Sequence, residues 1–507
     1  MSNTLLLEGI EEESTRGFTL NGASTFTSTL NKNLDFFSMA SAKRDDPTDA
    51  VKLFLAAYQE NPIISILNLF YCRDIRGGQG ERNIFRLCLE EIEDKYLENE
   101  FFLKLIPEYG RWDDLIMLLY KFGGRKNISQ SVIKIISDQI SKDLNSDNPS
   151  LCAKWVPLAN CVSNPKKKKV AKILVNLLQI SERNWRKMIT PIRQKLNLVE
   201  TNLTKKDYLS IEYDKLPSRA FNKYKNAFYR NDTVRFTDFL RSVQEGETKI
   251  NSNCVYPYEI IAQIRNKLID RYIEPSKEEL VMYNEMWKAL PKYKLHGNIL
   301  TVIDNSGSML KEVSSSSKAT AIDVSISLGI YTSEHNTGIF KDHFISFSRN
   351  PQVISLNPNF SIIDKLNYIY SLESGFNTNI QAVFDCILDT MIRKNVPFEE
   401  CPSIILIISD MEFDDVQGDQ NEVTNYQAIQ SKYRRYGYKM PQLVFWDVLS
   451  HDRNTPVRKD ENGVILISGL SPSIIQFVSE GETNPEKFML SVLNSERYQP
   501  IKDVISA

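Results

Sequence analysis

The residues best suited to chemistry lie directly after an apolar run that is typical of a buried strand. Asp304, Ser306 and Ser308 follow the run 299–303, and Gly307 separates the two serines. Carboxylate and hydroxyl oxygens are the ligands that hard divalent cations prefer. Because a buried strand fixes the backbone and Gly307 favours a tight turn, we expect these three side chains to converge on one ion.

Two later segments offer further oxygen ligands, which a magnesium site needs because one loop rarely completes an octahedral shell. Thr378 lies in a glycine-containing loop before the amphipathic run 380–392, and Asp410 follows the β-branched run 404–408. The carboxyl ends of neighbouring parallel strands meet at one edge of a sheet. The sequence therefore predicts one divalent-cation site, for Mg²⁺ first and for Mn²⁺ or Ca²⁺ as alternatives, formed by Asp304, Ser306, Ser308, Thr378 and Asp410. The other interpretation is that these residues only cap helices and turns.

Residues 298 to about 480 resemble a von Willebrand factor A domain, and the five predicted ligands match its metal-ion-dependent adhesion site position by position. The resemblance implies a doubly wound, mostly parallel, Rossmann-like α/β fold. It also implies that the Ser306, Ser308 and Thr378 hydroxyls touch the cation, while the acidic residues act directly or through water. One coordination position would be left for an acidic residue of a protein partner.

Motifs in the first half extend the resemblance to almost the whole chain. They are NGA at 21–23, YCRDIRGGQGER at 71–82, YGRWDD at 109–114, AKW at 153–155 and LPSRA at 216–220. These motifs resemble an uncharacterised family of plants, bacteria, fungi and large DNA viruses that joins a helical amino-terminal region to a von Willebrand A domain. The arrangement is more distantly similar to the Ro (TROVE) proteins, whose helical-repeat ring binds RNA. That likeness implies structured or single-stranded RNA as a second partner.

Hydrophobic periodicity divides the chain into a helical part and an alternating part. From about residue 49, apolar residues recur at helical spacing between short polar breaks, which favours a HEAT-like helical solenoid although no exact sequence period is present. After residue 298, β-branched strands alternate with helices. We predict an amino-terminal arm at 1–45, an α-helical repeat-like domain at 46–292, a von Willebrand A-like domain at 293–482, and a carboxy-terminal tail packing on the body at 483–507.

Positive charge is concentrated in the helical part. Residues 160–235 contain 18 basic and 6 acidic residues, a net charge of +12 in a chain whose net charge is −2. Aromatic residues are interleaved with them and could stack on bases. Two interpretations stay open: an RNA surface, or solvated lysine-rich helix faces with the aromatics in the core. The candidate RNA-binding residues are Lys166, Lys167, Lys168, Lys169, Arg183, Arg186, Lys187, Arg219 and Lys223.

The glycine-rich turn 77–80 lacks the Gly-Lys-Ser/Thr ending of a phosphate-binding loop, so it is better explained as a tight corner between helices. Three arginines surround it: Arg73, Arg76 and Arg82. They either pair with Asp74 and Glu81 or face an anionic ligand.

Composition places the protein among globular intracellular proteins. The chain has 507 residues, of which 42% are apolar and 25% charged, and this length exceeds a single hydrophobic core. It contains no run of about 20 apolar residues and no secretory signal at the amino terminus. Its seven cysteines are scattered without metal-ligand spacing. We expect a cytoplasmic protein without membrane partners.

Two functional classes remain open. The first is a non-enzymatic binding or scaffold protein that uses the cation to capture an acidic partner. The alternative is a metal-dependent phosphotransferase or phosphatase of haloacid-dehalogenase type, because such enzymes also place aspartates at the ends of parallel strands. Those enzymes use an acid two residues after the nucleophilic aspartate, and here that position is Ser306. We therefore expect no enzymatic activity.

Overall fold

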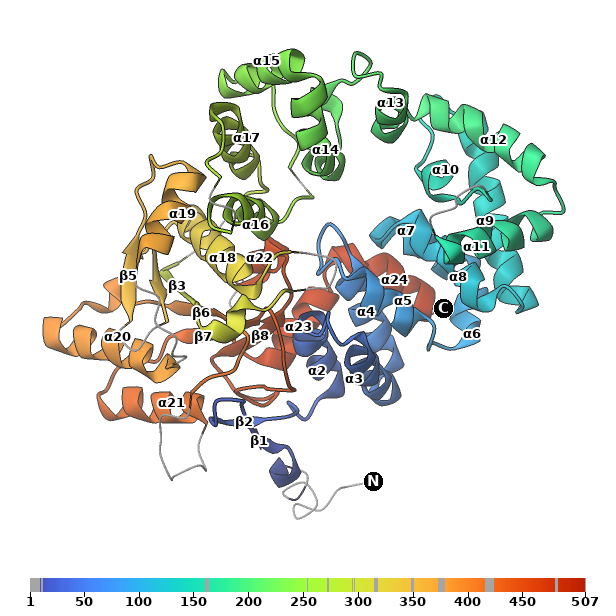
Figure 1. The fold of residues 1–507 in the computed structure, drawn as a ribbon. Helices are drawn as coiled ribbons and strands as arrows, with labels where there is room; N and C mark the ends of the chain where they lie inside the picture. Colours follow the sequence, from blue (N-terminus) through green and yellow to red (C-terminus); the bar gives the residue numbers. More distant parts are fainter. Residues whose placement is uncertain are drawn as a thin grey trace. The chain divides into compact units, whose positions relative to one another are not determined.

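The computed structural model describes residues 10, 12–159, 164–252, 254–270, 273–293, 295, 297–313, 318–347, 351–372, 379–414, 424–478 and 482–506. The chain forms two compact units, each built from segments that are distant in the sequence. The first unit comprises Met1–Asn68 and Thr237–Ser495, and the second comprises Leu69–Phe236 and Glu496–Ala507. Figure 1 shows the helices and strands of each.

A six-stranded sheet forms the centre of the first unit, in the strand order β5-β4-β3-β6-β7-β8. Neighbouring strands are parallel except for β5, which runs antiparallel to β4. The alternating strands and helices of the second half thus form the predicted mostly parallel α/β sheet. The strands are β3 (Ile299–Ile303), β4 (His343–Ser346), β5 (Gln352–Ser355), β6 (Ile404–Ser409), β7 (Gln442–Asp447) and β8 (Val464–Ser468).

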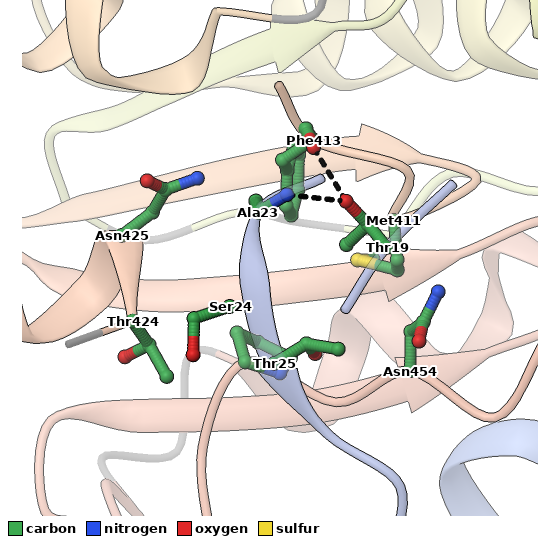
Figure 2. Close-up of a pocket in the computed structure, with 10 residues that line it drawn as sticks. Thr19, Ala23, Ser24, Thr25, Met411, Phe413, Thr424, Asn425 and Asn454 are labelled. Carbon is green, nitrogen blue, oxygen red and sulfur yellow. Dashed lines mark hydrogen bonds between the residues drawn. The ribbon is translucent and has the colours of Figure 1, made fainter. Parts of the chain in front are cut away.

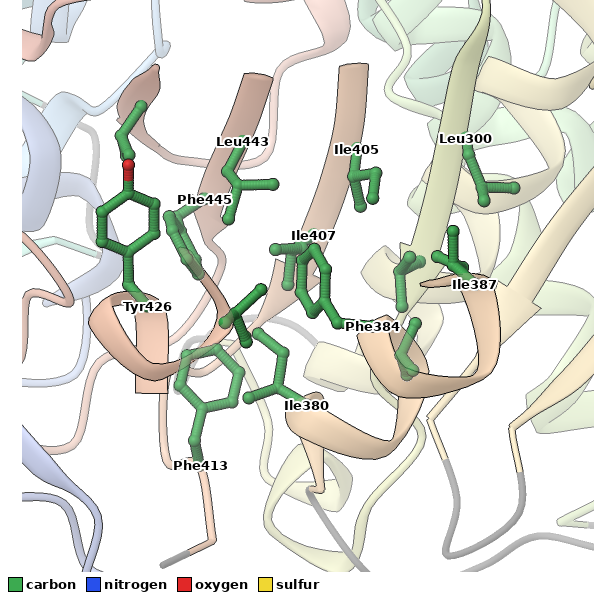
Figure 3. Packing of buried hydrophobic residues seen from close by; sticks show 14 of the residues in the cluster. Leu300, Ile380, Phe384, Ile387, Ile405, Ile407, Phe413, Tyr426, Leu443 and Phe445 are labelled. Carbon is green, nitrogen blue, oxygen red and sulfur yellow. The ribbon is translucent and has the colours of Figure 1, made fainter. Parts of the chain in front are cut away.

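Helices cover both faces of this sheet because successive strand residues point to opposite sides. On one face, Leu300 and Val302 join a core with α20 (Ile380–Lys394) and α21 (Asn425–Arg435), shown in Figure 3. On the other face lies α18 (Ala321–His335), where a Cβ on Gly329 would come within 2.7 Å of the Ile303 side chain. The close approach of α18 to β3 therefore requires a glycine.

Further helices and strands of the first unit come from both of its segments. They include β1 (Arg16–Phe18), β2 (Ser24–Phe26), α2 (Lys32–Met39), α3 (Pro47–Glu60), α16 (Pro257–Leu268), α17 (Lys277–Lys288), α19 (Ile362–Ser371), α22 (Ile475–Val478) and α23 (Pro485–Leu493). Helix α2 packs on β8, where Ser468 donates a hydrogen bond to the Phe37 carbonyl. Half-buried Arg265 of α16 pairs with buried Asp323 of α18 at 2.7 Å.

The boundaries of the two units differ from the predicted domain boundaries. The amino-terminal segment and α16 belong with the sheet because they pack on β8 and α18, contacts that periodicity does not encode. The carboxy-terminal segment is divided, since α23 packs on α2 and β8 whereas Glu496–Ala507 belongs to the second unit.

The second unit consists of helices in the part that the structure describes. They are α5 (Arg82–Leu89), α6 (Asp94–Glu98), α7 (Glu100–Tyr109), α8 (Trp112–Phe122), α9 (Lys126–Leu144), α10 (Cys152–Trp155), α11 (Pro165–Leu177), α12 (Glu182–Lys195), α13 (Val199–Lys205), α14 (Ser218–Asn231) and α24 (Gln499–Ser506). Two helices cross the unit boundaries: α4 (Pro62–Arg73) and α15 (Thr233–Gln244). The helical content agrees with the sequence, and the HEAT-type repeat stays a prediction.

The glycine-rich turn is a corner between helices, and its arginines have different neighbours from those expected. A Cβ on Gly78 would lie 2.0 Å from the Tyr71 carbonyl oxygen, so only glycine fits there. Buried Arg73 pairs with Asp114 at 2.7 Å, whereas Asp74 pairs with Arg497 at 2.7 Å. The interpretation that Arg73 pairs with Asp74 is therefore wrong, because the nearest carboxylates in space come from distant segments.

Candidate functional site

Two aspartates end adjacent central strands of the first unit. Ile303 of β3 pairs in register with Ile408 of β6, and the Asp304 amide continues this ladder by donating to the Ile408 carbonyl at 2.9 Å. Asp304 and Asp410 are both almost fully buried. The parallel pairing thus places two carboxylates at the same edge of the sheet, as the strand pattern predicted.

Hydroxyl groups surround the Asp304 carboxylate. The Ser306 amide donates to Asp304 Oδ1 at 2.9 Å, and Ser409 Oγ donates to Asp304 Oδ2 at 2.6 Å. Ser306 Oγ and Ser308 Oγ lie 3.0 Å apart. The two serines of the motif therefore present their oxygens together beside Asp304. Thr378, the fifth predicted ligand, lies outside the described residues.

The electrostatics of this edge favour a positive charge. Burial and the neighbouring Asp410 charge together raise the pKa of Asp304 to about 7. Within the described residues, Asp410 Oδ2 is buried and has no hydrogen-bond partner, and His451 Nε2 lies 3.7 Å from it. A buried carboxylate oxygen without a partner is unfavourable. A cation at this point would supply the missing partner and permit both carboxylates to ionise.

Several polar residues at the same edge were not predicted from the sequence to belong to the site. Ser409 was visible in the sequence as the residue before Asp410, but its bond to Asp304 depends on strand pairing. Asp447 ends β7 beside Ser409, and burial raises its pKa well above the ordinary value although Lys43 opposes the shift. Its position after the strand 442–446 was the available signal.

Glu412 is held by a segment almost four hundred residues earlier. Its carboxylate accepts hydrogen bonds from the Leu20 amide at 2.6 Å and from Asn454 Nδ2 at 2.9 Å. Asn21 Nδ2 donates to the Glu412 carbonyl at 2.6 Å. The 21–23 motif thus fixes the loop that follows Asp410.

A small cavity lies behind this loop, lined by residues of the amino-terminal strands and of the segments after β6 and β7 (Figure 2). Thr19 Oγ1 donates to the Phe413 carbonyl at 2.7 Å and accepts from the Ala23 amide at 3.0 Å. The cavity volume of about 10 Å³ is close to that of a single water site. It has no room for a larger ligand.

No group of three or more His, Cys, Asp or Glu side chains within the described residues is arranged to hold a metal ion. The predicted set contains only two carboxylates, and its other ligands are hydroxyls. The oxygen donors that are described fit a hard cation, which accepts hydroxyl and water ligands as well as carboxylates.

The candidate RNA-binding residues lie on three helices of the second unit. Lys166–Lys169 begin α11, Arg183, Arg186 and Lys187 lie on α12, and Arg219 and Lys223 lie on α14; all are exposed except half-buried Lys167. Many interleaved aromatics belong to the core instead, since Trp185, Tyr213, Phe221 and Phe228 are buried. Trp155 is only half-buried. The surface thus offers charge, with few aromatic faces for stacking.

Among the described residues, no helix is both long and apolar enough to cross a bilayer.

Comparisons with known proteins agree with the two-part organisation. Residues 298–503 match the family described as Domain of unknown function (DUF7788), and residues 127–293 match Domain of unknown function (DUF2828). Among solved structures, the RO (RSR) protein of Deinococcus radiodurans aligns with a TM-score of 0.38 and 10% identity, covering 88% of this chain and 93% of that one. The uncharacterised protein L728 of Acanthamoeba polyphaga mimivirus is 26% identical over 522 residues, covering 96% of this chain and 88% of the viral protein. The similarity to the viral protein thus extends along nearly the whole chain.

Proposed function

We propose that the sheet of the first unit is a von Willebrand A-type domain that binds a divalent cation, most readily Mg²⁺, and uses it to capture an acidic group of a protein partner. One observation carries this proposal. Among the described residues, the buried Asp410 Oδ2 has no hydrogen-bond partner at the edge where buried Asp304 and two serine hydroxyls converge.

Each described residue of the set has a role in this proposal. Ser306 Oγ and Ser308 Oγ, only 3.0 Å apart, would bind the ion directly. Asp304 and Asp410 would balance its charge, and Thr378 would add a third hydroxyl. Magnesium requires six ligands in near-octahedral geometry. A site with few protein carboxylates leaves positive charge and an open position, which a partner's Asp or Glu can fill.

A binding role explains the site better than the phosphotransferase alternative. Both Asp304 oxygens already accept hydrogen bonds, from the Ser306 amide and from Ser409 Oγ, which makes this carboxylate a poor nucleophile. Ser306 occupies the position where a haloacid-dehalogenase enzyme needs an acid. Mg²⁺-dependent phosphate release from a model ester, lost in Asp304→Asn, would reverse this preference.

The test replaces Ser306 and Ser308 together by alanine and measures Mn²⁺ binding by electron paramagnetic resonance and Mg²⁺ binding by calorimetry. We expect cation affinity to fall at least about 100-fold, with retention of acidic partner peptides falling in parallel. The matched control is Ser471→Ala with Ser473→Ala, because these two hydroxyls also lie 2.9 Å apart in the same unit. Equal cation binding in the two double variants would refute the proposal.

A second candidate function concerns the second unit, which we propose to be a HEAT-like scaffold that binds RNA. The support is the net charge of +12 over residues 160–235 together with the exposure of most of its basic residues on α11, α12 and α14. Phosphate contacts would dominate the affinity and make it steeply dependent on salt. Fluorescence anisotropy with labelled RNA at two salt concentrations tests this, with Lys166–Lys169 replaced by alanine as the variant. Absence of binding at low salt would remove the RNA role. We expect both activities to operate in the cytoplasm.

A further inference from the structure

Three cations from separate segments surround one half-buried tryptophan of the second unit. The Arg111 guanidinium lies 5.3 Å from the Trp155 ring centroid, and the Lys154 and Lys167 ammonium groups each lie 5.9 Å from it. Arg111 precedes α8, Trp155 ends α10, and Lys167 lies in the first turn of α11. Cation–π contacts hold cations at such distances and leave their hydrogen-bond donors available.

A second, similar group of two cations and one aromatic ring lies on α8 and α11. Exposed Tyr120 of α8 has the ammonium groups of Lys166 and Lys169 at 5.5 and 4.8 Å from its ring centroid. Helices α8 and α11 pack directly against each other. Two cation–aromatic groups thus lie along one helix pair, and they present several positive charges in succession.

Carboxylates neutralise only part of this charge. Lys154 pairs with Glu200 at 3.1 Å. Asp113 and Asp114, the acids that follow Arg111, are bound by Arg86 at 2.8 and 2.6 Å, and Asp114 also binds Arg73. Within the described residues, neither the Arg111 guanidinium nor the Lys167 ammonium group forms an ion pair with a carboxylate, while the Arg111 backbone amide donates to Asp114 Oδ2 at 2.9 Å. Burial lowers the pKa of Arg111; the charges of Arg73 and Arg82 add to this shift, and those of Asp113 and Asp114 oppose it.

Helix α11 adds to the positive potential. Its thirteen residues begin with Pro165, the first turn contains Lys166, Lys167 and Lys168, and no acidic residue lies in that turn. The amino terminus of a helix carries a partial positive charge, and basic residues there are unfavourable. An anion bound at this end would relieve that repulsion. Helix α8, in contrast, has Asp113 and Asp114 in its first turn.

We propose that Arg111 and Lys167, held around Trp155 together with Lys154, form a phosphate-binding site, and that Lys166 and Lys169 at Tyr120 hold a second phosphate. The arginine fork can bind two phosphate oxygens, and the lysines add point charges. Because the cations lie over the rings, the aromatics position the cations rather than stack on bases. A nucleic-acid backbone and a free polyphosphate share this chemistry. The nucleic-acid source rests on the RNA function proposed above, whereas the phosphate site does not.

The experiment compares two double variants of the full-length chain that remove the same charge. Arg111→Gln with Lys167→Gln removes the proposed ligands. Lys168→Gln with Lys172→Gln removes two exposed lysines of the same helix. Lys167→Gln alone is a third variant, because it alters only one half-buried side chain in a first turn. Anisotropy with a labelled ten-nucleotide uridine RNA at several salt concentrations gives affinity and salt slope, and calorimetry measures pyrophosphate binding.

We expect the Arg111/Lys167 variant to lose about tenfold or more in RNA affinity and to reduce the salt slope by about 0.7, since one phosphate contact on a single strand contributes about 0.7. Lys167→Gln alone should give about half of each change, and the control pair should change affinity less than about threefold. Equal loss in both double variants would overturn the site and leave the RNA function intact. Pyrophosphate binding that is lost only in the Arg111/Lys167 variant, without RNA binding, would support the site and reject the RNA function. Binding of neither ligand by the unmodified protein would overturn both.

Discussion

The sheet edge of the first unit and the α8–α11 surface of the second unit differ in the sign and the burial of their charges. Asp304, Asp410 and Asp447 are almost fully buried at neighbouring strand ends. Around Trp155 and Tyr120, by contrast, the uncompensated charges are cations at half-buried or exposed positions. Concentrated buried charge favours one small counterion, whereas spread and accessible charge favours a ligand with repeated charges.

The two regions also differ in what neutralises their charge within the chain. Asp114 in the second unit is surrounded by arginines, whereas Asp410 Oδ2 in the first unit has no hydrogen-bond partner in the part of the chain that the structure describes. A buried carboxylate whose hydrogen bonds are all made stabilises the fold around it, whereas a buried carboxylate oxygen without a partner can be neutralised by a bound cation. Substitutions that remove a carboxylate should therefore have opposite effects in the two regions.

The largest effect is expected for Asp114→Asn. Asp114 is buried and accepts from Arg73 Nε at 2.9 Å, Arg73 Nη2 at 2.7 Å and Arg86 Nε at 2.6 Å. Loss of its charge leaves buried Arg73 unpaired, so the free energy of unfolding should fall by about 3–5 kcal/mol in urea denaturation. Asp94→Asn is the control, because its ion pair with Arg125 is exposed. Equal stability of the two variants would contradict a central role for Asp114.

The next effect concerns Mg²⁺ and Asp410. At 100 times the dissociation constant, Mg²⁺ should raise the free energy of unfolding of the unmodified protein by about 2.7 kcal/mol. Asp410→Asn should abolish this gain, while its cation-free form should be at least as stable as the unmodified protein because a charge beside Asp304 is gone. Thermal unfolding with Mg²⁺ or with chelator measures both. If Asp410→Asn is less stable than the unmodified protein without cation and is still stabilised by Mg²⁺, then Asp410 has a structural role like that of Asp114 and is not a cation ligand.

The smallest effect is a pH dependence that should separate the regions. Because the pKa of Asp304 is raised from 3.8 to about 7, its protonation favours the cation-free fold below pH 4, and this contribution is lost as pH rises through 7. A bound cation replaces that proton, so Mg²⁺ affinity should fall about tenfold per pH unit below 7, or about 1.4 kcal/mol. Titration calorimetry between pH 5.5 and 8 provides the measurement.

Phosphate binding at Arg111 and Lys167 should change little over the same pH range, since arginine and lysine side chains ordinarily keep their charge there. An Mg²⁺ affinity that is independent of pH would show that Asp304 is ionised without the cation. A parallel pH dependence at both sites would instead point to a change in the whole protein.

Local sequence patterns determined most of the sheet unit. The β-branched run 404–408 predicted β6, and the positions of Asp304 and Asp410 after strands placed them at one edge. The antiparallel strand β5 (Gln352–Ser355) was missed because it is short and has only two apolar residues.

Strand periodicity and oxygen-bearing residues at strand ends are encoded locally, and so the sequence alone determined the sheet, its edge and the main predicted ligands. Tertiary structure decided which distant groups meet them: Leu20 at Glu412, Ser409 at Asp304, and Arg111 and Lys167 at Trp155. Hydrogen bonds and cation–π contacts act over only a few ångströms, so they form where loops and helix packing bring segments together. The spacing of residues along the chain does not encode these contacts.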